Sequence, residues 1–149
     1  MLILEHNKHN GIYLYECDEN TISKNIYQLF LQKIGKKPIA QNILISNKET
    51  SIEEIKAFLY RSILCDYNTL FVVEINEYLS DYKQGIMYNC LDELLLYKME
   101  KYKANKGLYI EKSKTNEYLD SCLVFIFEHK NKVLRVYVQL ISCCIIRVG

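Results

Sequence analysis

The sequence lacks an excess of charge of either sign. Lys and Arg total 19 and Asp and Glu total 18, so the formal net charge is +1. Proteins that bind nucleic acids gather basic residues on one face, whereas the basic residues here are interleaved with acids along the chain. The composition therefore excludes a nucleic-acid footprint, and we expect the partners to be proteins or the rest of a larger chain.

Paired cysteine motifs and targeting segments are also missing. There are six cysteines, but no two form a C-x-x-C pair and no histidine stands at zinc-finger spacing from one. The start, MLILEHNKHNG, has three apolar residues between Met1 and a glutamate, too few for the apolar part of a signal peptide. We therefore predict a cytoplasmic protein whose cysteines are small buried hydrophobic residues and which holds no metal.

Half of the residues are hydrophobic, which is enough for a core of two or three layers. Short apolar runs rich in Ile, Leu, Val, Phe and Tyr predict strands over residues 11–17, 42–46, 69–75 and 121–127. The second of these is bulky on both faces, as a strand covered by helices should be.

Helical spacing of apolar residues fills each interval between these strands. The first predicted helix ends at Gly35, the second begins at Thr50 or Ser51, and the third begins at Ser80 or Asp81. The order is β-α-β-α-β-α-β, and crossovers of this length require parallel pairing. The predicted fold class is α/β, with three layers and a mostly parallel sheet.

We assign residues 1–128 to a single α/β domain that contains a polar loop over residues 104–118. Residues 129–149 form an apolar tail that is interrupted by Arg135 and Arg147. This tail is too short and too charged for a stable membrane span, which needs about 20 apolar residues. Three interpretations of it stay open: a further pair of strands, a helix, or a segment foreign to the fold that results from truncation.

Many P-loop ATPases share this order of elements and bind nucleotide after the first strand. A glycine-rich loop there cradles the phosphates with backbone N–H groups, and a lysine reaches the β and γ oxygens. The corresponding turn here, ECDENT over residues 16–21, has no glycine and no lysine, and its acids would repel a triphosphate. Gly35 and Lys36 end a helix instead of opening one. The sequence therefore predicts no cofactor site for ATP or magnesium in this chain.

Three candidate catalytic residues follow the third and fourth strands. Glu74 and Glu77, in VVEINE, resemble the acids at the magnesium-site strand of such ATPases, although Ile75 stands where the catalytic acid would be. His129 follows the fourth strand, where a polar sensor residue often lies. The simpler interpretation is that all three are strand-end side chains facing solvent or capping a helix, so we expect this chain alone not to be an enzyme.

Several segments are similar in sequence to a known protein family. PIAQNILIS, KETSIEE, AFLYRSILC and LFVVEI resemble parts of mysterin-like proteins, giant ring-finger E3 ubiquitin ligases built on an AAA+ core, and the similarity extends over roughly residues 11–128. The resemblance implies ATP hydrolysis with magnesium in some AAA+ units and zinc-dependent ubiquitin transfer in a distant part of a larger chain. Neither a phosphate loop nor a zinc-ligand set matches here, so the resemblance implies a degenerate AAA+ core, as a fragment or a short paralogue.

Three functions therefore stay open. In the first hypothesis the chain is a non-catalytic structural module of a larger ligase or ATPase. In the second it is an independent small α/β nucleotide- or ligand-binding domain that uses Glu74, Glu77 or His129. In the third hypothesis it is a protein-interaction module that displays residues 98–118.

Overall fold

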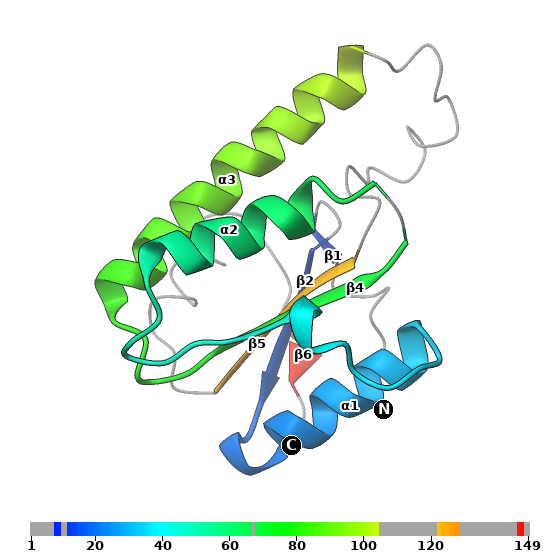
Figure 1. Cartoon of the computed structure of the whole chain (residues 1–149), viewed down its shortest axis with the longest axis vertical. Helices are drawn as coiled ribbons and strands as arrows, with labels where there is room; N and C mark the ends of the chain where they lie inside the picture. Colours follow the sequence, from blue (N-terminus) through cyan, green and yellow to red (C-terminus); the bar gives the residue numbers. More distant parts are fainter. Residues whose placement is uncertain (1–7, 10–11, 67, 105–121, 129–145, 148–149) are drawn as a thin grey trace.

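A computed structural model of the chain describes residues 8–9, 12–66, 68–104, 122–128 and 146–147 (Figure 1). Its helices are α1 (Ile22–Lys33), α2 (Ile52–Ile63) and α3 (Asp81–Ala104), with short 3-10 turns η2 (Glu19–Thr21) and η3 (Ala40–Asn42). Its strands are β1 (Lys8–His9), β2 (Ile12–Cys17), β3 (Ile43–Ile45), β4 (Leu70–Ile75), β5 (Cys122–Glu128) and β6 (Ile146–Arg147). The predicted alternation of strands and helices is confirmed.

The described strands form one sheet in the order β1-β2-β5-β4-β3, and β6 also pairs with β2. Pairing is parallel throughout except between β1 and β2. In the register, Ile126 of β5 lies between Tyr15 of β2 and Glu74 of β4. The mostly parallel sheet is confirmed, and the carboxyl ends of β2, β5 and β4 therefore meet at one edge.

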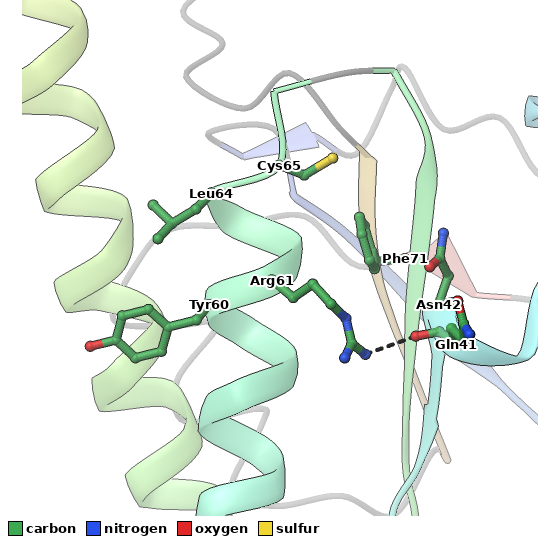
Figure 2. A pocket seen from close by; sticks show the side chains of 7 residues that line it. All are labelled: Gln41, Asn42, Tyr60, Arg61, Leu64, Cys65 and Phe71. Atoms are coloured by element: carbon green, nitrogen blue, oxygen red, sulfur yellow. Dashed lines mark hydrogen bonds between the residues drawn. The ribbon is translucent and has the colours of Figure 1, made fainter.

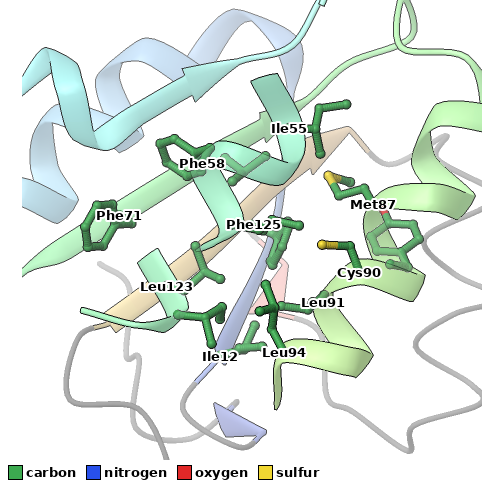
Figure 3. Packing of buried hydrophobic residues seen from close by; sticks show 14 of the residues in the cluster. Ile12, Ile55, Phe58, Phe71, Met87, Cys90, Leu91, Leu94, Leu123 and Phe125 are labelled. Carbon is green, nitrogen blue, oxygen red and sulfur yellow. The ribbon is translucent and has the colours of Figure 1, made fainter. Parts of the chain in front are cut away.

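Helices cover both faces of the sheet, so the molecule has three layers (Figure 1). On one face α1 packs through residues such as Leu29 and Phe30 on Val72 and Val124. On the other face α2 and α3 enclose a larger core, part of which is shown in Figure 3 with Phe58, Met87 and Phe125. Burial on both faces explains why β4 reads as a continuous apolar run, LFVV, without alternation.

The structure decides the helix boundaries that the sequence left open. The Ser51 hydroxyl, not that of Thr50, accepts the N–H of Glu54 at 3.1 Å and caps α2. Ser80 accepts the N–H of Lys83 at 3.2 Å at the start of α3. After α1, Gly35 adopts a φ of 77°, the left-handed conformation that glycine tolerates best.

Two predictions about strands need correction. The second predicted strand, observed as β3, lies at the edge of the described sheet and is not fully covered, since the Ile45 side chain is 56 % exposed. The two-residue strand β1 was not predicted, because Lys8 and His9 carry no apolar pattern.

The remaining segments are described only in part. Of the predicted loop over residues 104–118, Ala104 is the last residue of α3 and the others lie outside the described residues. Of the predicted tail, Ile146 and Arg147 form a strand parallel to β2, whereas residues 129–145 lie outside the description. Among the described helices, none combines the length and apolar character needed to cross a bilayer.

Candidate functional site

The carboxyl edge of the sheet is where a ligand site is expected in this architecture. Open α/β sheets bind ligands beyond the carboxyl ends of their strands, at the point where the connections diverge to opposite faces. Here β2 leads to α1 on one face, whereas β3 and β4 lead to α2 and α3 on the other. The turn between β2 and α1 is therefore the first place to test for a site.

This turn is short and closed by its own hydrogen bonds. Four residues, Asp18 to Thr21, separate the end of β2 from the start of α1. The carbonyl oxygen of Asp18 accepts both the backbone N–H of Thr21 at 3.0 Å and the Thr21 hydroxyl at 2.9 Å. A phosphate-binding loop of the G-x-x-x-x-G-K-[ST] type places four residues between two glycines and adds a lysine, whereas this turn has four residues in all and neither a glycine nor a lysine, so it cannot wrap a phosphate in that way.

A chain of buried hydrogen bonds lies beneath the turn. The hydroxyl of Tyr15 on β2 donates to Oδ1 of Asn25 on α1 at 3.3 Å. Nδ2 of Asn25 donates to Oγ1 of Thr21 at 3.2 Å, which links the network to the Asp18 carbonyl. Asn25 and Tyr15 are both buried. The network therefore holds the first turn of α1 against the sheet.

Cys17, the last residue of β2, is fully buried beside this network and is a thiol. Burial raises the pKa of the Cys17 thiol, and the charges of Asp18 and Glu74 raise it further, while hydrogen bonds with Asn25 and Thr21 act in the opposite direction. A raised pKa leaves little thiolate at neutral pH, and the thiolate is the nucleophilic form. Cys17 is fully buried in the core between the sheet and α1, so its observed role is packing.

The structure describes two of the three predicted candidate residues. Glu74 is half-buried near the carboxyl end of β4, close enough to Cys17 for its charge to act on the thiol. Glu77 is exposed in the turn between β4 and α3. His129 lies outside the described residues.

The polar groups at the carboxyl ends of β3 and β4 hold the backbone together. The Ser46 hydroxyl donates to the carbonyl of Glu74 at 2.7 Å, and Nδ2 of Asn76 donates to the carbonyl of Ser46. Oδ1 of Asn76 accepts the N–H of Tyr78 at 2.9 Å, which starts the turn into α3. Sequence reasoning missed this role, although an asparagine that directly follows a strand is a typical start of such a turn.

A pocket lies at the opposite, amino-terminal edge of the sheet (Figure 2). It has a volume of about 510 Å³ and is lined by the last turn of α2, by η3 and by the start of β4. Its lining residues are Gln41, Asn42, Tyr60, Arg61, Leu64, Cys65 and Phe71. The pocket is thus far from the edge where ligands of α/β sheets are expected, and sequence reasoning did not identify it because its walls come from three separate elements.

Within the described part of the chain, no three His, Cys, Asp or Glu side chains are grouped so that they could hold a metal ion. Comparison of the chain with protein-family models, curated proteins and solved structures finds no match.

Proposed function

We propose that this chain is a non-catalytic, AAA+-like α/β module with a structural role in a larger protein that resembles mysterin-type E3 ubiquitin ligases. The observation that carries the proposal is the four-residue turn between β2 and α1, which closes on itself through the Asp18 carbonyl. It occupies the place where a P-loop ATPase would hold its nucleotide.

The arrangement of β2 supports the AAA+-like part of this proposal. β2 is the first strand of the parallel array, it lies between β5 on one side and β6 on the other, and it leads directly into α1. In P-loop proteins the phosphate loop joins such a strand to such a helix. In this proposal β2 and α1 are the counterparts of those two elements, joined by a four-residue turn in place of the loop.

Charge and packing support the non-catalytic part. Asp18 is exposed at this turn, and a unit charge repels a like charge at 4 Å by about 1 kcal/mol even in water. Buried side chains of Tyr15, Cys17 and Asn25 fill the space beneath the turn. A triphosphate would meet repulsion and filled space in place of a cradle of N–H donors.

Isothermal titration of the full chain with ATP and magnesium tests the proposal. We expect no saturable heat at millimolar nucleotide, and ADP serves as a second ligand that carries less charge. A cooperative thermal transition, followed by circular dichroism on the same sample, establishes that the protein is folded. Saturable binding in the micromolar range would overturn the proposal.

A further inference from the structure

We infer that the open edge of β3 pairs with the same edge of a second copy of this chain, so that the two sheets join across a two-fold axis. β3 is the last strand of the described sheet, and among the described residues none pairs with it on the side away from β4. Such an edge offers unpaired backbone N–H and C=O groups to another strand. The inference goes beyond the proposed function and does not depend on it.

Hydrogen bonds to β4 establish which backbone groups of β3 face outward. The N–H of Ser46 donates to the carbonyl of Glu74 at 3.2 Å. Because the backbone groups of successive strand residues point to opposite edges, Leu44, two residues before Ser46, also directs its groups toward β4. The N–H and C=O groups of Ile43 and Ile45 therefore point away from β4, toward the open edge.

The sequence of β3, Ile-Leu-Ile, is symmetric about Leu44, as pairing across a two-fold axis requires. In an antiparallel pair centred on Leu44, Ile43 of each copy lies opposite Ile45 of the other, and each such pair exchanges both of its N–H···O bonds. This register uses the outward-facing groups of both residues in both copies. It also covers the Ile45 side chain, which is 56 % exposed, with the partner's Ile43.

The amino-terminal end of β3 is basic. Lys36 and Lys37 are exposed in the segment between α1 and η3, which leads into the strand. Arg61 lies at the same end, because its Nη2 donates to the carbonyl of Gln41 at 2.8 Å (Figure 2). Residues 34–45 include no acid, so this end presents only positive charge along the chain that leads to the edge.

The carboxyl-terminal end of β3 is acidic. Glu49 is exposed in the turn that follows the strand, and Glu53 and Glu54 are exposed in the first turn of α2. Residues 46–55 contain a single basic residue, Lys48. A two-fold axis places the basic end of each copy against the acidic end of the other, whereas a parallel arrangement would set like charges together. The charges therefore favour an antiparallel second copy.

Sedimentation equilibrium of the full chain measures the association. We expect the mass to rise from one chain toward two, with a dissociation constant on the order of 100 μM, as for a small transient interface. The association should weaken as salt screens the charges. Hydrogen exchange followed by NMR should show that the amides of Ile43 and Ile45 gain protection as the protein concentration rises, whereas the amide of Leu44 is protected throughout.

Two matched substitutions separate this edge from the rest of the surface. Ile45→Lys places a charge against the partner's Ile43 and should weaken dimerisation at least about tenfold. Leu96→Lys makes the same change on α3, at a side chain that is 51 % exposed, and should leave dimerisation unchanged.

Charge reversal tests the antiparallel orientation. Glu53→Arg/Glu54→Arg makes both ends of the edge basic, and Lys36→Glu/Lys37→Glu makes both ends acidic. Each double variant alone should therefore dimerise at least about tenfold more weakly than the unsubstituted chain. An equimolar mixture of the two should recover the association, because every basic end then meets an acidic one.

Glu93→Arg/Glu100→Arg is the control for net charge, since it makes the same change as the first double variant at exposed positions of α3. It should alter the dissociation constant by less than about threefold, because exposed charges far from the interface are screened. Circular dichroism of each variant establishes that it is folded.

The inference is wrong if the chain stays monomeric up to about 1 mM, well above the concentration expected for a transient interface. It is also wrong if Ile45→Lys dimerises as well as Leu96→Lys, or if the mixture of charge-reversed variants associates no better than either alone. Should a charge-reversed variant fail to fold, the Ile45→Lys comparison and the exchange of the Ile43 and Ile45 amides decide the question. Binding of ATP at the β2 turn would leave these results unaffected, so the two proposals fail separately.

Discussion

Asn25 links the closed turn to the sheet. Its side chain is the one link between the Tyr15 hydroxyl on β2 and the Thr21 hydroxyl at the start of α1 among the hydrogen bonds described above. Sequence reasoning placed Asn25 on no face in particular, because an asparagine in a helix is most often polar surface. Its burial arises from contact with a tyrosine ten positions earlier, which helical spacing alone cannot indicate.

We predict that Asn25→Ala lowers the free energy of unfolding by about 1–3 kcal/mol, since it leaves buried polar groups without their partner. Tyr15→Phe removes one hydroxyl and keeps the ring, so its cost should be smaller, about 0.5–1.5 kcal/mol. Urea denaturation of both single variants and of the double variant measures the coupling between them. Additive effects of the two substitutions would contradict a direct link between these side chains.

At the scale of single elements, alanine substitutions at two glycines should change the stability of the protein in opposite directions. Gly35 follows α1 at a φ of 77°, whereas Gly85 lies inside α3, and a Cβ added at either position would meet nothing within 4 Å. Because no steric contact intervenes, each substitution reports backbone conformation alone.

Gly35→Ala should destabilise the protein by about 1 kcal/mol, because alanine disfavours the left-handed region. Gly85→Ala should stabilise it by about 0.5–1 kcal/mol, because alanine favours the helix. Chemical denaturation midpoints of the two variants, compared with the unsubstituted chain, measure the difference. Changes of the same sign would show that one of the two local conformations is wrong.

The elements also show which features of the fold sequence patterns can predict. β4 was predicted to within one residue, since an uninterrupted apolar run between turn signals has few alternatives. The edge position of β3 was not predicted, because the number of neighbours of a strand depends on the sheet order. Arg61 looked like ordinary polar helix surface, and its place in a pocket depends on η3, twenty residues earlier in the chain.

At the scale of the whole molecule, the core contains thiols and phenols that resist ionisation. Burial raises the pKa of Tyr15 from 10.0 to about 12, and it also raises the pKa values of Cys17, Tyr88 and Cys90. All four side chains are buried, and they belong to both faces of the sheet. Alkaline pH should therefore lower the stability of the entire fold.

Proton linkage makes the folded state less stable as pH rises. Below about pH 9, the ordinary value for cysteine, these groups are protonated in both states and their contribution is fully present. Above it the unfolded chain loses protons that the folded chain keeps, so the unfolded state gains stability as pH rises through 9 and toward 12.

We therefore predict that the free energy of unfolding falls steadily between pH 9 and pH 11. Urea denaturation at several pH values measures the slope, and Tyr15→Phe should reduce it above pH 10. A stability that stays flat over this range would contradict the burial of these groups.

The structural role proposed for this chain requires that the turn after β2 be closed to nucleotide. Amide resonances of Thr21 and Ile22, the last residue of the turn and the first of α1, report on it directly during titration of the ¹⁵N-labelled full chain with ATP and magnesium. We predict that both resonances keep their positions at 5 mM nucleotide. This is roughly the concentration that would half-saturate a site whose binding free energy is only about 3 kcal/mol. Saturable shifts of both resonances at micromolar ATP would show that the turn opens to bind phosphate, and the proposed structural role would then be wrong.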